Sequence, residues 1–410
     1  MLNSITRVKQ FIAENWEKTI RFPNQQSQAE VPLPYPFIVP TAGPFFHIFF
    51  YWDTYFASEG LIRSGMLENA RYNAENMLHL IDTLGYVPNF TLLEQLNRSQ
   101  PPVASALVRA IYERTHDKTW LSRASSILAK EHAFWLSMRR GPHGLNHYAQ
   151  HGNPKDVQDF YEVIKERLCN IPADKTEQMI FLAHSMAEAE SGWDFTPRFN
   201  YQCANFYPVD LNSLLYTHEN NAAWFCEELG DEKASLWRVR AANRRELMDR
   251  YCWNDQIGFY YDYNFSNNQP SPVASAAAFF ALWSGLPSIS QAEKMVHNLP
   301  LLEYNFGIVA CQPGPRPPGQ QYQWDYPNAW APSQYATIAG LLRYGFILEA
   351  RRLAEKYVAC VVNSFDKTGN LWEKYNGVNG SVDVIDEYKM PAMLGWTAGT
   401  FLYACEVLES

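Results

Sequence analysis

The sequence predicts an all-α fold, a toroid of helical hairpins whose inner helices line a cleft and whose loops at one end carry the chemistry. Two observations support this fold class. Apolar residues return at three- and four-residue steps along most of the 410 residues, whereas strand-like alternation is limited to short pieces such as GFYYDYNF near Gly258. The loops between the helical segments are rich in Trp, Gly and Pro, which is typical of functional loops on a rigid scaffold.

Helical periodicity recurs in an ordered series of segments. The first covers residues 53–85 and divides near Gly65 into two helices. The further segments are 101–115, 120–140, 210–229, 231–252, 333–365 and 399–409. Several of them begin at Asp or Ser, which are preferred at helix N-caps. Residues 271–290 are uncharged but interrupted by Pro, Ser and Gly, so they predict a buried helix and not a membrane span.

The chain reads as one folding unit. Hydrophobic residues make up 47% of it and charged residues 19%, which allows a large core. No Pro/Gly/Ser linker or break in composition divides it. We therefore expect an N-terminal helix and lead-in segment over residues 1–35, followed by a single catalytic barrel domain over residues 36–410.

Charge and composition exclude several classes of protein. The net charge is −9 and no run of five or more Lys or Arg occurs, so we expect no nucleic-acid partner. The histidines form neither HxH nor HExxH, so we expect no metal site. Seven scattered cysteines without a CxxC pair, and an N-terminus without an apolar stretch, favour a cytoplasmic protein without a membrane partner. The oligomeric state is not indicated.

Aromatic residues make up 15% of the chain, and three stretches place a Trp beside a carboxylate. These are ESGWDFTPRF with Asp194, LWEKYNG with Glu373 and QWDYPNAWAP with Asp325. A carboxyl against a ring face loses hydration, so its pKa rises and it can stay protonated, as a general acid must. One such acid and one ionised carboxylate form the pair that hydrolyses a glycosidic bond. The alternative is that each carboxylate is a helix N-cap or a surface charge beside a core Trp.

Six motifs show a resemblance to a known family. QWDYPNAWAP resembles the second signature of the trehalase family of inverting glycoside hydrolases. ESGWDFTPRF and WEKY resemble the segments that bear the family's catalytic aspartate and glutamate. VPNFTLLEQLNRSQPP, FYWDTYF and GWTAG resemble three further family segments, and all six follow the family order from about residue 36 to about residue 400.

The resemblance implies an (α/α)6 barrel and an inverting mechanism without cofactor or metal. It assigns Asp194 as the general acid that protonates the glycosidic oxygen and Glu373 as the general base that activates water. Inversion needs room for that water, so the two carboxyl groups are expected roughly 6.5–9.5 Å apart. The residues that the resemblance places in or behind the sugar pocket are Phe50, Trp52, Asp53, Asn89, Arg98, Gln100, Trp193, Arg198, Trp324, Asp325 and Glu387.

The chain departs from the family pattern where the family clamps its sugar with arginine. PTAGPFFHIFFYWD lacks the Arg and Glu of the first signature. LNHYAQHGNPKD offers His147, His151 and Lys155 in a region where the family uses an Arg. The family also has a glycine-rich run that ends in EY, and only Glu387 and Tyr388 of it remain here. A missing arginine changes how a hydroxyl is held and can redirect specificity.

Three hypotheses of function follow. The first is an α,α-trehalase that releases two glucose molecules, with the ring of Trp324 facing the sugar and Asp325 accepting bonds from its hydroxyls. The second is a related inverting α-glycosidase acting on glucosylglycerate or mannosylglycerate. The third is a sugar-binding barrel without catalytic activity, against which the presence of both Asp194 and Glu373 argues.

Overall fold

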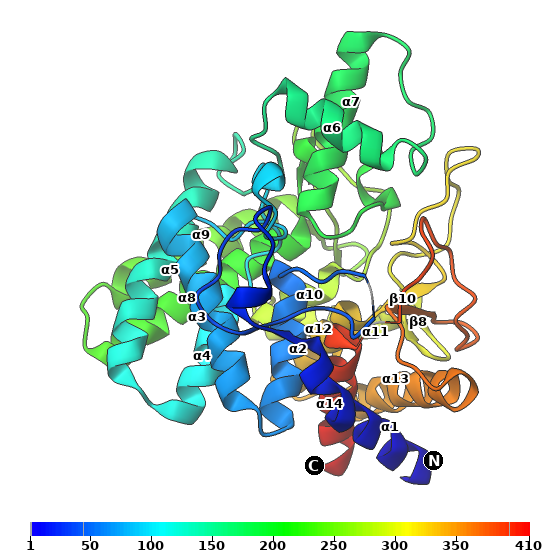
Figure 1. Cartoon of the computed structure of the whole chain (residues 1–410). Coiled ribbons are helices and arrows are strands. Elements are labelled where there is room, and N and C mark those ends of the chain that lie inside the picture. Colours follow the sequence, from blue (N-terminus) through cyan, green and yellow to red (C-terminus); the bar gives the residue numbers. More distant parts are fainter. Residues whose placement is uncertain (1, 44, 393) are drawn as a thin grey trace.

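The computed structural model describes residues 2–43, 45–392 and 394–410, and these are mostly helical (Figure 1). The strands in the described ranges are two or three residues long and pair in small antiparallel ribbons. The pairs are β1 (Ile20–Arg21) with β2 (Phe37–Ile38), β4 (Trp253–Asn254) with β5 (Phe259–Tyr260), β8 (Glu303–Tyr304) with β9 (Gly307–Ile308), β10 (Asn328–Trp330) with β11 (Lys374–Asn376), and β6 (Tyr263–Asn264) with both β3 (Phe206–Tyr207) and β7 (Gln269–Pro270). The all-α prediction is confirmed.

Within the described residues, six helices form a closed inner ring. They are α2 (Tyr51–Arg63), α4 (Ala104–Thr115), α8 (Val209–Leu229), α10 (Ala278–Ser284), α12 (Ala331–Arg343) and α14 (Gly395–Glu409). Each helix contacts the next in this order, and α14 contacts α2, which closes the ring. Most residues of these helices are buried, because neighbours pack on several sides of each.

An outer layer of helices packs around this ring. It consists of α1 (Leu2–Asn15), α3 (Leu67–Leu84), α5 (Lys118–Met138), α9 (Ala234–Tyr251), α11 (Ile289–His297) and α13 (Ile347–Thr368). Helix α3 contacts α2 and α4, α5 contacts α4 and α8, α9 contacts α8, and α13 contacts α12 and α14. Alternation of inner and outer helices along the chain is the (α/α)6 barrel, as predicted.

Helix α1 belongs to this outer layer and packs on α13, beside α14 in Figure 1. Its residues Val8 and Ile12, with Trp16 just after it, join the main apolar core. The apolar core therefore continues across residue 36, and the domain boundary placed there stays a prediction. The predicted buried helix in 271–290 is the short α10, and none of the described helices has the length and apolarity needed to cross a membrane.

The closest approach of two inner helices depends on glycine. A Cβ atom on Gly399 of α14 would lie 1.8 Å from the carbonyl oxygen of Phe56 in α2, and one on Gly60 would lie 2.7 Å from the Cα of Gly399. No side chain fits at such distances. The second glycine of GWTAG therefore lets α2 and α14 pack backbone to backbone.

A helical hairpin that the sequence analysis did not predict stands outside the ring, at the top of Figure 1. It consists of α6 (Pro154–Ile164) and α7 (Lys175–Glu190). Its apolar cluster includes Ile164 and Leu182 and extends to Phe195 and Tyr322, which lie in the loops before α8 and α12. The hairpin is thus anchored to the two loops that carry ESGWD and QWDY.

The loops that precede the inner helices meet at one end of the barrel. The backbone N–H of Trp52 at the start of α2 donates to Gln100 before α4, and Trp324 before α12 donates to the carbonyl of Phe195 before α8. Strands β10 and β11 join the loops before α12 and α14. Every predicted site residue lies in these loops or in the first turn of α2.

Candidate active site

The two predicted catalytic carboxylates, Asp194 and Glu373, both lie in the loops at this end of the barrel. Asp194 lies between α7 and α8 with 32% of its side chain exposed, whereas the Glu373 side chain, just before β11, is 3% exposed. Asp53 lies close enough to both that the charges of Glu373 and Asp194 each raise its pKa. The three carboxyl groups therefore form one electrostatic cluster.

Glu373 is held by two donors. The Tyr388 hydroxyl donates to its Oε1 at 2.7 Å, and the Lys374 ammonium donates to its Oε2 at 2.8 Å. Lys374 is fully buried and also pairs with Asp386 at 2.6 Å. A carboxylate accepts about four hydrogen bonds, so each oxygen of Glu373 keeps a lone pair for a further donor such as water.

Asp194 is linked to Glu387 through an arginine. Arg167 places Nη2 at 3.0 Å from Oδ2 of Asp194 and at 2.8 Å from Oε2 of Glu387. The other oxygen of Glu387 accepts from the backbone N–H groups of Phe195 and Gln323 at 3.3 and 3.4 Å. Burial raises the pKa of Glu387 to about 7, against the opposing charge of Arg167.

Asp53 lies buried in the first turn of α2, near enough to the predicted catalytic residues Asp194 and Glu373 to feel their charges. Burial, followed by the charges of Glu373 and Asp194, raises its pKa to about 8. At neutral pH the Asp53 carboxyl is therefore mostly protonated. In that form it can both donate a hydrogen bond to a sugar oxygen and accept one.

Asn in place of Asp53 is expected to stabilise the fold increasingly as pH rises. The folded pKa of about 8 lies above the ordinary 3.8, so the folded form holds an extra proton between these values. The stability of the Asp53 protein is thus greatest below pH 3.8 and falls as pH rises to about 8. Denaturant unfolding should show Asp53→Asn about 4–6 kcal/mol more stable at the upper end and equal at the lower end. A stability difference that does not change with pH would contradict the buried, protonated carboxyl.

The tryptophans of the motifs form a buried stack and not an open platform. Trp324 stacks on Trp330 with centroids 3.9 Å apart, and Trp193 and Trp52 pack against Trp324 at 4.6 and 5.7 Å. All four rings are at most 2% exposed. The stack therefore supports the loops from beneath.

Partly exposed rings near the site belong to phenylalanines. Phe50 packs against Phe46 at 5.7 Å and against Phe90 at 5.4 Å, and all three are partly exposed. Arg98 lies over the Phe90 ring at 5.5 Å. Among the residues that the structure describes, these rings are better placed than the tryptophans to meet a sugar face.

Two predicted sugar-binding residues have their polar atoms bonded to protein groups. Arg198 is fully buried, pairs with Asp210 and Asp262 at 2.8 Å each, and lies over the Trp193 ring at 4.5 Å. Both oxygens of Asp325 accept from Arg316, at 2.6 and 2.7 Å. In this structure Arg198 supports the tryptophan stack, and Asp325 fixes the loop that carries Arg316.

The NRSQPP loop combines backbone support with one charged group that lacks an acidic partner. Asn89 donates to the carbonyl of Ala189 at 2.9 Å, and Gln100 accepts from the N–H of Trp52 at 3.1 Å. Buried Arg98 donates from Nη1 to Asn97 at 2.7 Å, while its Nε has no partner in the described structure. Burial lowers the pKa of Arg98 to about 10, so it stays charged at neutral pH.

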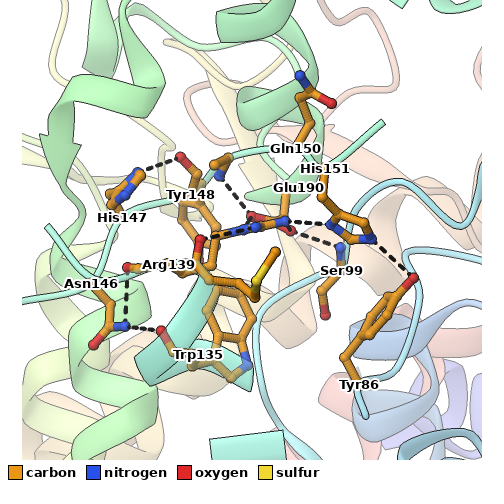
Figure 2. Close-up of polar contacts among 12 residues, drawn as sticks. Tyr86, Ser99, Trp135, Arg139, Asn146, His147, Tyr148, Gln150, His151 and Glu190 are labelled. Carbon is orange, nitrogen blue, oxygen red and sulfur yellow. Dashed lines mark hydrogen bonds and ion pairs between the residues drawn. The ribbon is translucent and has the colours of Figure 1, made fainter. Parts of the chain in front are cut away.

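Glu190 joins several segments of the chain through hydrogen bonds, as Figure 2 shows. It is fully buried and accepts from Arg139 at 2.8 and 2.9 Å and from the backbone N–H groups of Ser99 and Ala149 at 2.8 Å each. Arg139 also donates to Nδ1 of His151 at 2.9 Å. We call these residues the Glu190 network. It joins the ends of α5 and α7 to the loop that carries Arg98.

The three residues of LNHYAQHGNPKD noted above do not contact Asp194 or Glu373. Because arginine only donates, Nδ1 of His151 accepts and its Nε2 donates to the carbonyl of Leu96 at 2.9 Å. His147 contacts the carbonyl of Tyr148 at 3.1 Å, and exposed Lys155 pairs with Asp159 at 2.7 Å. All three side chains are bonded away from Asp194 and Glu373.

Sequence reasoning missed five residues that contact the predicted site residues. Tyr388 and Lys374 are adjacent in sequence to Glu387 and Glu373, so adjacency was a usable signal. The side-chain amide of Gln323, from the QWD motif, donates to the carbonyl of Asp194. Arg167 and Arg316 lie outside every recognised motif and could not have been found from spacing.

Comparison with known proteins identifies the family. The sequence model of the trehalase family matches residues 2–409. The cytosolic neutral trehalase of Saccharomyces cerevisiae is 30% identical over 416 residues, covering 91% of this chain and 55% of the yeast protein. A periplasmic trehalase of Xanthomonas axonopodis pv. citri is 30% identical over 432 residues, covering 97% and 72%. The chain thus spans about half the length of the yeast relative.

Solved structures agree with this family and with the fold. The neutral trehalase Nth1 from Saccharomyces cerevisiae superposes with a TM-score of 0.81 at 27% identity, covering 97% of this chain and 80% of the other. A mannosylglycerate hydrolase from Thermus thermophilus, solved with glucose, gives a TM-score of 0.66 at 20% identity over 97% and 99%, which shows a shared fold alone. The barrel, the ordered motifs and the match over residues 2–409 lead to one conclusion: this chain belongs to the trehalase family of glycoside hydrolases.

Proposed function

We propose that the protein is an inverting α,α-trehalase that hydrolyses trehalose to two glucose molecules. The observation that carries the proposal is the presence of Asp194 and Glu373 at one end of a trehalase-family barrel, where Glu373 accepts from Tyr388 and Asp194 shares Arg167 with Glu387. Inverting glycosidases use two carboxyl groups on opposite sides of the scissile bond. The 27% identity to a solved trehalase supports trehalose as the substrate.

In this proposal Asp194 is the general acid. It is the more exposed of the two carboxyl groups, and Arg167 engages only its Oδ2. Oδ1 is therefore the oxygen that carries the proton and gives it to the glycosidic oxygen as the bond breaks. Since the departing sugar leaves as a neutral alcohol, no negative charge has to be stabilised on it.

Glu373 is the general base. Tyr388 and Lys374 fix the direction of its carboxylate, and its remaining lone pairs receive the proton of the attacking water. Water attacks the anomeric carbon from the face opposite the leaving oxygen, so an α-glucoside gives β-glucose. The mechanism requires only side chains of this chain, and we propose no cofactor or metal.

The sugar is held by groups around this pair. Neutral Asp53 donates to or accepts from a hydroxyl, and Arg98 offers its unpartnered Nε. Phe50 supplies a partly exposed ring. Glu387 already accepts from Arg167 and from two backbone N–H groups, so it holds Arg167 beside the sugar. We propose that seven further buried residues support the sugar pocket by positioning its loops; these are Trp52, Asn89, Gln100, Trp193, Arg198, Trp324 and Asp325.

A substrate panel tests the proposal. We expect glucose release from trehalose with kcat/KM at least about 10-fold above that for glucosylglycerate or mannosylglycerate, because each missing hydroxyl contact is worth roughly that factor. A preference for mannosylglycerate would favour the related glycosidase. Binding of trehalose without turnover would favour the silent sugar-binding barrel.

We also propose a cytoplasmic location. The cytosolic relatives and the seven free cysteines of the described chain support it. The periplasmic relatives give the alternative. Fractionation of the native host cell, with the protein followed by antibody, distinguishes the two compartments.

A further inference from the structure

Arg167 reaches the catalytic carboxylates from outside the barrel ring. It lies in the loop between α6 and α7, and the next residue, Leu168, is buried in the hairpin's own apolar cluster. That cluster includes Phe195, the residue after Asp194. Because Leu168 and Phe195 belong to one apolar cluster, the neighbouring Arg167 is held next to Asp194, the predicted acid.

The contacts of Arg167 occupy only part of its guanidinium. Nη2 bonds Asp194 at 3.0 Å and Glu387 at 2.8 Å, and Nε donates to Glu387 at 2.9 Å. The group lies over the rings of Phe195 and Tyr388, at 5.1 and 5.4 Å. In the described structure Nη1 has no hydrogen-bond partner, and 18% of the side chain is exposed.

This arrangement has two chemical consequences. Guanidinium only donates, so its hydrogen bond to Oδ2 favours the acid proton on Oδ1. Nη1 belongs to the same guanidinium as the Nη2 that contacts Asp194, and its two N–H groups remain able to bind a hydroxyl of a bound sugar.

We propose that Arg167 is a positioning and substrate-binding residue of this site, orienting Asp194 through Oδ2 and binding a sugar hydroxyl through Nη1. The assignment rests on the proposed function, because it concerns the same reaction. It supplies a guanidinium from the α6–α7 hairpin, whereas the PTAGPFFHIFFYWD segment has none.

Several charged or titratable groups surround Asp194. They are Arg167, Glu387, Asp53, Arg98, Glu188 and Tyr388. Arg167 contacts the carboxylate directly. Its loss should misplace the acid, and it should slow a substrate whose leaving oxygen needs a proton more than one whose leaving fluoride needs little.

The experiment compares Arg167→Gln and Arg167→Lys with the wild type, using the full chain with trehalose and with α-glucosyl fluoride. For Arg167→Gln we expect KM for trehalose to rise about 10-fold and kcat on trehalose to fall about 10- to 100-fold, with a much smaller fall of kcat on α-glucosyl fluoride. Lysine keeps the charge but not the fork, so Arg167→Lys should lose less kcat on trehalose than Arg167→Gln while KM still rises. Lys165→Gln, two residues away and paired only with exposed Glu162, is the matched control that should leave all three quantities unchanged.

Each outcome decides a part of the proposal. An unchanged KM in both variants overturns sugar binding, and equal losses of kcat on the two substrates in Arg167→Gln overturn the orienting role. Thermal unfolding of each variant separates a loss of folded protein from a change in these constants. A wild type that hydrolyses another glycoside of the panel, and not trehalose, refutes the proposed function, and the same variants are then read on that glycoside. A wild type that hydrolyses none of them overturns both.

Discussion

Asp194→Asn is expected to lower kcat on trehalose by about 10²–10⁴-fold without unfolding the protein. Asparagine keeps the size of the side chain and can still accept from Arg167, but it has no proton for the glycosidic oxygen. Glucose release and the thermal unfolding midpoint measure the two effects. Asp366→Asn, which alters an exposed carboxylate paired with Arg7, is the control.

A substrate with a different leaving group separates the acid from the base. In α-glucosyl fluoride the leaving fluoride needs little protonation, so Asp194→Asn should lose much less activity on it than on trehalose. Glu373→Gln removes the base for water attack and should lose activity on both substrates alike. Full trehalose turnover by Asp194→Asn would show that the acid is another residue, and equal losses on both substrates would assign Asp194 to the attack of water.

The second large effect is expected in the Glu190 network. Glu190→Gln leaves the guanidinium of Arg139 buried without its counter-charge, and breaking such a pair costs about 3–5 kcal/mol of unfolding free energy. Ser99, which donates to Glu190, lies between Arg98 and Gln100 in the sequence. A weaker bond there should displace these two predicted sugar-site residues, so we also expect a higher KM for trehalose.

Denaturant unfolding of Glu190→Gln, Arg139→Met and the double variant measures this cost. The double variant should lose less than the sum of the single variants, because neither charge is then left alone. Lys155→Met, which breaks an exposed pair with Asp159, should change stability by less than about 1 kcal/mol. Additive losses, or a Glu190→Gln protein as stable as the wild type, would contradict the coupled buried pair.

Much of the barrel follows from the sequence, because amphipathic period and helix caps are local properties. The segments 53–85 and 333–365 each contain one inner and one outer helix. The first divides near Gly65, as predicted, whereas the division of the second near Gly345 was not predicted. The sequence did not lead us to predict helices α6 and α7, although Asn153 and Asp174 cap them, because that region contains no recognised motif. Their connection to the site depends on tertiary packing against Phe195, which a local sequence pattern does not reveal.

The site was predicted less completely, for a spatial reason. Neighbours in sequence point in different directions, so Trp324 is buried in a ring stack while Asp325 pairs with Arg316. Pairings such as Arg198 with Asp262 join residues 64 apart, and a single sequence gives no sign of them. The assignments of Asp194 and Glu373 as acid and base stay predictions.

The central claim is inversion at the anomeric carbon of trehalose by this chain, and proton NMR of the early reaction tests it most directly. We expect α- and β-glucose to appear in equal amounts before mutarotation, since one half of trehalose is attacked with inversion and the other leaves with its configuration kept. Release of α-glucose alone would show retention, and no release of glucose would refute trehalase activity. Either result would contradict the roles given to Asp194 and Glu373.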